Sequence, residues 1–218
     1  MNATLIGGHS IEGPRTTIGF TMLGRQRSEP ATKDRLGVGH RLLLTKPLGT
    51  GILLAALMQG RLPAAAYQPL IESMTLSNAV ALDLIREFRV TALTDVTGFG
   101  LAGHLAEMLR ASGCSAELER SRIASLPSTQ ELVDQGIEST LAPENRVLPE
   151  GVTLSTAQLT SAQTAVLFDP QTSGGLLIGV AAGQVESVLE RLRSAGHREA
   201  AEIGVVREAP RGSEIRVR

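Results

Sequence analysis

One carboxylate stands beside a glycine-rich turn in the segment from Leu93 to His104. The apolar residues before Asp95 are typical of a strand, and the turn Thr97-Gly98-Phe99-Gly100 follows it. Glycines at positions 98 and 100 permit backbone angles closed to other residues and allow a ligand to approach closely. Helical spacing then appears in the apolar residues Leu101, Leu105, Met108 and Leu109.

The first turn of that helix leaves several N–H groups without partners, and we expect them to point back toward Asp95. Such groups attract phosphate, and a carboxylate oxygen is a ligand that Mg²⁺ prefers. The segment therefore predicts a place where Mg²⁺ and a polyphosphate meet. The alternative is a purely structural connection in which Asp95 only caps the turn.

Three further segments combine small or polar residues with the end of a predicted strand. Residues 167–180 hold a polar, glycine-containing loop that enters the apolar strand Leu176–Val180, and Pro170 disfavours helix at Asp169. Residues 5–10 end in Gly7-Gly8-His9-Ser10, and residues 42–51 run from an apolar strand into a turn that contains Lys46. Lys46 is either a point charge for phosphate or a solvated lysine at a strand end.

Strands and helices alternate along the chain, which indicates an α/β or α+β fold. We expect strands at residues 2–6, 16–23, 41–45, 115–118, 176–180, 202–206 and 214–217. Helices are expected at residues 51–59, 69–88, 128–135 and 183–195, with an irregular surface excursion over residues 136–160.

Composition limits the classes of partner. The formal net charge of −1 and the 20% charged residues give no electrostatic reason to expect nucleic acid or an anionic membrane. Aromatic residues make up only 2%, so platforms for base stacking are not expected. No segment has the length and apolar character of a membrane span or the pattern of a signal peptide, so we expect a cytoplasmic protein.

The single cysteine, Cys114, excludes an internal disulfide framework. No lysine, arginine or histidine lies next to it in the sequence, so we expect an ordinary small residue and not a nucleophile. Among the histidines, His104 is expected to lie on the helix after Asp95, where it either faces the turn or is satisfied structurally. His40 and His197 are expected at the surface.

Together the four segments resemble selenophosphate synthetase (selenide, water dikinase), within the superfamily of aminoimidazole ribonucleotide synthetase. The resemblance covers essentially the whole chain, and its last two motifs are the specific ones. The matching residues are Gly7-Gly8-His9-Ser10, Thr45-Lys46-Pro47-Leu48-Gly49, Thr94-Asp95-Val96-Thr97-Gly98-Phe99-Gly100 with Gly103-His104, and Asp169-Pro170-Gln171-Thr172-Ser173-Gly174-Gly175-Leu176-Leu177.

The resemblance implies a C-terminal α/β domain at residues 40–218, a linker at 28–39, and the last strands of an ATP-binding N-terminal domain at 1–27. It also implies ATP and Mg²⁺ as cofactors, with Asp95 binding the metal and Gly7, Gly8, His9 and Ser10 contacting ATP. The implied reaction converts ATP, selenide and water into selenophosphate, AMP and phosphate. The implied assembly is a homodimer that pairs through residues near the N-terminus.

This sequence departs from the family pattern in one large respect. In full-length family members, the half before the Gly-Gly-His-Ser segment carries the reactive cysteine or selenocysteine, a lysine near it and further metal-binding aspartates. That half has no counterpart here. We therefore assign no catalytic residue and expect the chain alone to be inactive, since phosphoryl transfer depends on those metal ions. The chain is then an isolated domain, the product of a truncated reading frame, or one piece of a split or fused enzyme that acts with a separate or fused N-terminal catalytic half.

Two other interpretations remain open at this point. The first is a different ATP-using member of the superfamily, such as a purine-biosynthetic amidine-forming enzyme, a thiamine-phosphate kinase or a hydrogenase maturation factor. The second is a non-catalytic module that dimerises or docks. The Asp-Pro-Gln-Thr-Ser-Gly-Gly segment favours the selenium enzyme over the other superfamily members.

Overall fold

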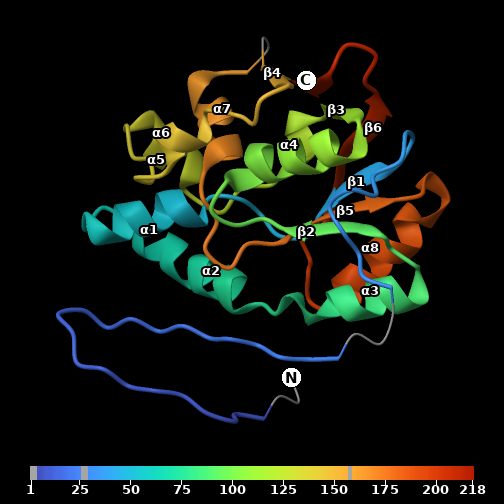
Figure 1. The fold of residues 1–218 in the computed structure, drawn as a ribbon. Coiled ribbons are helices and arrows are strands. Elements are labelled where there is room, and N and C mark those ends of the chain that lie inside the picture. The colour runs from blue at the N-terminus through green and yellow to red at the C-terminus, as the bar shows by residue number, and fades with distance from the viewer. Residues whose placement is uncertain (1–3, 26–28, 157–158) are drawn as a thin grey trace.

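A seven-stranded mixed sheet carries the fold in the computed structural model, which describes residues 4–25, 29–156 and 159–218 (Figure 1). The strand order is β2-β5-β1-β6-β3-β7-β4. Neighbouring strands are antiparallel except for the pairs β3–β7 and β7–β4, which are parallel. The strands are β1 (Arg41–Leu44), β2 (Ala92–Asp95), β3 (Cys114–Leu118), β4 (Val152–Ser155), β5 (Leu176–Val180), β6 (Ala201–Glu208) and β7 (Ser213–Val217).

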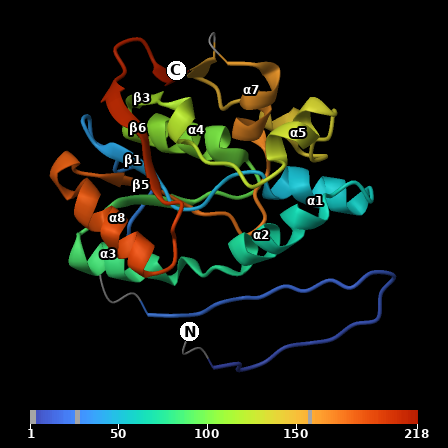
Figure 2. The same cartoon turned by 180° about the vertical axis from the view of Figure 1, so that it is seen from behind.

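Helices pack on both faces of the sheet and divide the core in two (Figures 1 and 2). Alternation along β1 sends Leu42 and Leu44 into the larger core, with α4, and Leu43 into the smaller core, with α3 and α8. The helices are α1 (Thr50–Met58), α2 (Ala64–Thr75), α3 (Ala81–Glu87), α4 (Gly100–Ser112), α5 (Thr129–Asp134), α6 (Ala142–Asn145), α7 (Ser161–Phe168) and α8 (Val185–Ser194).

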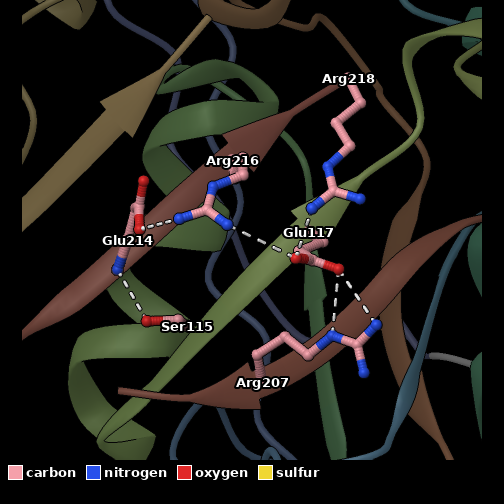
Figure 3. A network of polar contacts seen from close by, with 6 residues as sticks. All are labelled: Ser115, Glu117, Arg207, Glu214, Arg216 and Arg218. Atoms are coloured by element: carbon pink, nitrogen blue, oxygen red, sulfur yellow. Dashed lines mark hydrogen bonds and ion pairs between the residues drawn. The ribbon is translucent and has the colours of Figure 1, made fainter. Parts of the chain in front are cut away.

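The polar face of β3, β6 and β7 carries a network of charges centred on Glu117 (Figure 3). One carboxylate oxygen of Glu117 accepts hydrogen bonds from Nε and Nη2 of Arg207 at 3.1 and 3.0 Å. The other accepts from Nη2 of Arg218 at 3.1 Å and lies 3.7 Å from Nη1 of Arg216. Isolated pairs this exposed contribute little to stability, but this network joins side chains of three strands that the backbone already pairs.

The expected strands 41–45, 115–118, 176–180, 202–206 and 214–217 are confirmed, with small shifts at their ends. The expected helix 69–88 is wrong as one helix, because the chain breaks between α2 and α3. Leu76 is extended (ψ 120°), its carbonyl accepts a hydrogen bond from Lys46, and Ser77 then caps a short 3-10 turn over Asn78–Val80. The break therefore depends on a lysine that is 30 positions earlier in the chain.

Three further elements differ from the prediction. The short helix α6 and the strand β4 lie within residues 136–160, which were predicted to be an irregular excursion, and α7 follows where no helix was predicted. The helix α7 begins with a capping box, in which Thr160 and Gln163 satisfy each other's backbone N–H groups. Thr160 and Gln163 were the available signal for this helix. None of the helices in the described ranges is long and apolar enough to cross a membrane.

Residues 4–25 form an extended, exposed arm that runs out and back beneath α2 and α3 in both views (Figures 1 and 2). The predicted strands at 2–6 and 16–23 are wrong over residues 4–25, to which the structure assigns no strand; Asn2 and Ala3 lie outside the described residues. A strand needs a neighbour, and the seven-stranded sheet does not extend to this arm.

Candidate functional site

Asp95 is the last residue of β2, and its side chain is exposed. The carboxylate forms no hydrogen bond or ion pair with any residue that the structure describes, and α4 has no side-chain cap at its start. The alternative in which Asp95 only caps the turn is therefore not supported. Gly100 has a φ of +68°, which turns the chain from the strand into α4, whereas Gly98 has no such backbone angle.

His104 faces the turn from the first half of α4. Its Nε2 lies 3.1 Å from Oγ1 of Thr97, and its Nδ1 lies 3.3 Å from Oε2 of Glu107, although the second pair does not meet hydrogen-bond geometry. Burial, followed by the nearby charge of Lys33, lowers the pKa of His104, so the imidazole is neutral at pH 7. The histidine thus faces the turn through Nε2, whereas its buried Nδ1 has no hydrogen-bond partner among the described residues.

The segment 169–172 closes the N-terminus of α1 through its side chains. Oε1 of Gln171 accepts from the backbone N–H of Gly49 at 3.1 Å and from the hydroxyl of Thr50 at 3.2 Å. Oδ2 of Asp169 accepts from the N–H of Gly51 at 3.1 Å. These contacts satisfy N–H groups that a helix start leaves free, so two of the four motifs complete each other.

Asp169 is completely buried, and only its Oδ2 is bonded; Oδ1 has no partner among the described residues. Burial raises the pKa of its carboxyl to about 7, and the hydrogen bonds from the backbone around Gly51 and from Gln171 only partly oppose that shift. The carboxyl therefore changes charge near neutral pH.

Lys46 is 2% exposed, so the prediction of a solvated lysine is wrong. Its ammonium donates to the carbonyls of Ser73, Leu76 and Ser173 at 3.0, 2.7 and 2.9 Å, which join the end of α2 to the polar loop before β5. Burial lowers the pKa of Lys46 to about 8. All three N–H bonds are used within the protein, so this lysine contributes charge but no free donor.

The loop before β5 also contacts the Asp95 turn. Gln171 donates its N–H to the carbonyl of Thr97 at 2.9 Å, and Val96 donates to the carbonyl of Gly175 at 2.8 Å. A Cβ on Gly174 would lie 2.0 Å from the carbonyl oxygen of Val96. The turn after β1, the turn after β2 and the loop before β5 are therefore one interlocked unit, and glycines at their contacts serve close packing of the backbone.

The structure does not bring the four predicted ATP-contacting residues to this unit. Gly7, Gly8, His9 and Ser10 all lie exposed in the arm of residues 4–25, and the space where a Cβ would stand on Gly7 or Gly8 is open. Among the described residues, no group of three or more His, Cys, Asp or Glu side chains could hold a metal ion, so Asp95 stands as a single carboxylate.

The remaining predictions for cysteine and histidine have mixed outcomes. Cys114 is buried, and burial raises the pKa of its thiol, which confirms the prediction of an ordinary residue. The surface prediction for His197 is wrong: the residue is 1% exposed, because Gly196 (φ +96°) turns the chain back onto the end of α8. His40 is half-buried and accepts a hydrogen bond from the N–H of Gly37.

Comparison with known proteins decides the family. The family described as "AIR synthase related protein, C-terminal domain" matches residues 37–216. The chain belongs to this family. Its mixed α/β fold agrees with the architecture that the resemblance implies.

Curated relatives of this AIR synthase-related chain carry the name "Selenide, water dikinase". The protein from Pelobacter propionicus is 37% identical over 207 residues, which cover 94% of this chain and 60% of that protein. The protein from Pseudomonas straminea is 39% identical over 206 residues, covering 92% of this chain and 56% of that protein. The chain therefore spans little more than half the length of these relatives.

Solved structures support the fold. A crystal structure of hydrogenase maturation protein HypE superposes with a TM-score of 0.62 at 21% identity, covering 82% of this chain and 47% of that one. Thiamine-monophosphate kinase from Stenotrophomonas maltophilia K279a gives a TM-score of 0.57 at 19% identity, covering 87% and 54%. At these identities the similarity concerns the fold of the AIR synthase-related domain.

Proposed function

We propose that the chain is the C-terminal part of an ATP-dependent selenophosphate synthetase, which converts ATP, selenide and water into selenophosphate, AMP and phosphate. The observation that carries this proposal is the exposed carboxylate of Asp95, which has no ion-pair partner among the described residues and is held by the interlocked turns. The chain is 37–39% identical to proteins named selenide, water dikinase. Residues 40–218 are the C-terminal domain, 28–39 the linker and 1–27 the end of the ATP-binding domain.

Asp95 would bind Mg²⁺ in this proposal. The fit is that of a partial site. Asp95 is one exposed carboxylate with no ion-pairing cation in the part of the chain that the structure describes, and it can serve a metal that takes one or two protein carboxylates and keeps waters and phosphate oxygens as its other ligands. Mg²⁺, when bound, would neutralise phosphate charge. Asp95 supplies the oxygen, while the interlocked loop fixes the backbone on either side of the turn.

Changing Asp95 to Asn is expected to weaken binding of Mg-ATP about tenfold, the loss of roughly one charge-assisted contact. Isothermal titration of ATP into the chain, with and without Mg²⁺, measures this effect. The change Asp134→Asn, at an exposed carboxylate that ends α5, is the matched control and should leave the Mg²⁺ dependence unchanged. Equal Mg²⁺ dependence in wild-type protein and Asp95→Asn would count against the assignment.

The chain by itself is proposed to be inactive, because one carboxylate is a weak metal site and the AIR synthase-related match accounts for only part of the longer relatives. Purified chain given ATP and selenide should release AMP no faster than the uncatalysed reaction. ATP, selenide and a separate or fused N-terminal half are the proposed partners, and the cytoplasm is the proposed location.

A second candidate function, dimerisation or docking, is favoured by the arm of residues 4–25. Seven of the fifteen exposed large apolar side chains among the described residues lie in this arm, including Ile18 at 74% and Phe20 at 86% exposure. Apolar residues gathered on an extended, unpaired segment favour pairing with another chain. The arm would join either a second copy or the N-terminal half.

Phe20→Asp is expected to shift a dimer of this chain to monomer, since the charge would be buried at the interface. Sedimentation velocity at increasing protein concentration measures the change. Met58→Asp, at an equally exposed residue (81%) on α1, is the control and should leave the dimer intact. A wild-type chain that stays monomeric at high concentration would exclude self-association through the arm.

A further inference from the structure

A cleft of about 810 Å³ opens behind the interlocked unit, on the side of Lys46. The end of α2, the segment 125–127 and the turn 196–199 form its walls. Asp95 and Thr97 are not among its lining residues, so this cleft is separate from the proposed metal position.

Buried polar atoms without partners gather on this cleft. Eight buried side-chain nitrogen and oxygen atoms in the described part of the chain have no hydrogen-bond partner, and four of them belong to residues that line the cleft. They are Oγ of Ser73, Oγ of Ser125 and both ring nitrogens of His197. Ser73 and His197 are 9% and 1% exposed. Buried polar groups are almost always hydrogen-bonded, so such a concentration calls for polar partners at the cleft, either ordered water or a ligand.

The charges on the cleft favour an anion as that ligand. Lys46 is one of its lining residues, is 2% exposed, and forms no ion pair with a carboxylate in the described residues. A buried cation without a counter-ion is costly, and its field repels a second cation. Arg198, Glu72 and Glu199 are exposed lining residues and stay hydrated at the mouth.

We propose that the cleft binds a small oxyanion of the phosphate class. The hydroxyls of Ser73 and Ser125 and one ring N–H of His197 donate hydrogen bonds to its oxygens, and the ammonium of Lys46 supplies the opposite charge. The backbone of Thr45 and Ser77 lies near the imidazole of His197, and neither ring nitrogen has a hydrogen-bond partner among the described residues. The volume leaves room for an organic group attached to the phosphate.

The test measures thermal unfolding of the full chain in inorganic phosphate, in glycerol phosphate, and in sodium chloride at matched ionic strength. Binding to the folded state alone raises the midpoint temperature with ligand concentration, so phosphate should raise it above the chloride control. A larger rise with glycerol phosphate would identify a monoester as the preferred ligand; an equal or smaller rise would identify the inorganic ion. Both outcomes support the site.

The double change Ser73→Ala/Ser125→Ala is expected to weaken phosphate binding at least tenfold. Without phosphate, the same variant should be as stable as the wild type or more stable, because it removes unpartnered hydroxyls. Ser121→Ala/Ser194→Ala, at exposed hydroxyls away from the cleft, is the matched control and should bind phosphate as the wild type does.

Nuclear magnetic resonance supplies a second measurement that does not depend on stability. Phosphate should shift the imidazole resonances of His197 and leave those of His40, which lies outside the cleft lining, unchanged. The proposal is overturned if phosphate and chloride give the same midpoint, or if the double serine variant keeps wild-type affinity. The proposed selenophosphate synthetase activity does not enter either measurement.

Discussion

Gly174→Ala should lower the free energy of unfolding by about 3 kcal/mol, at the upper end of what overpacking costs. The added Cβ would lie 2.0 Å from the carbonyl oxygen of Val96 and 2.7 Å from Cβ of Gln171. Neither neighbour can retreat easily, because Val96 is hydrogen-bonded to Gly175 and Gln171 is hydrogen-bonded to Thr97. Urea denaturation followed by circular dichroism measures the loss.

Gly98→Ala is the matched control for this substitution. Gly98 lies in the same interlocked unit, lacks a positive φ, and has open space where the Cβ would stand. Its free energy of unfolding should stay within about 0.5 kcal/mol of the wild-type value. Equal stability of the two variants would show that the loop before β5 does not pack against the Asp95 turn as described.

Asp169→Asn should become more stable relative to the wild type as the pH rises from 5 to 8. The pKa of Asp169 is raised from 3.8 to about 7, so the folded protein holds a proton there that the unfolded chain has released. The contribution of Asp169 to the stability of the folded wild type is therefore largest below pH 4, and it is lost as the pH rises toward 7. Asparagine does not titrate and can still accept a hydrogen bond from the N–H of Gly51.

The expected divergence is roughly 3 kcal/mol between pH 5 and pH 8, by the linkage between pKa and stability. Urea denaturation of both proteins at several pH values measures it. Asp134→Asn, at an exposed carboxylate, should follow the wild type at every pH. A constant difference between Asp169→Asn and the wild type would mean that Asp169 does not titrate in this range.

Local patterns predicted the parts of the fold that depend on local chemistry. The core strand β5 and the helix after Asp95 have apolar spacing that suffices to identify them. The single helix expected over residues 69–88 failed because a distant lysine holds the carbonyl of Leu76 outside helical geometry. The arm of residues 4–25 failed for the opposite reason, since β-like composition does not make a strand without a neighbour.

The sequence identified several residues of the candidate site, but it did not predict which of them contact one another. Motif recognition found Asp95 and the segment 169–175, yet no local signal indicates that Gln171 and Asp169 complete the start of α1. The burial of Lys46 and His197 was equally hidden, because polar residues after a strand or helix usually lie at the surface. Such contacts join positions more than 100 residues apart, which a pattern read along the chain does not connect.

The closure of α1 by side chains far along the chain also constrains the order of events during biosynthesis. Gln171 accepts a hydrogen bond from the N–H of Gly49, which is 122 positions earlier in the chain. Asp169 accepts one from the N–H of Gly51, which is 118 positions earlier. A ribosome that has released only the first half of the chain has therefore exposed an apolar helix whose leading amides still face water. Contacts of such long sequence separation delay folding, so the start of α1 can be completed only after residues 169–171 have left the ribosome.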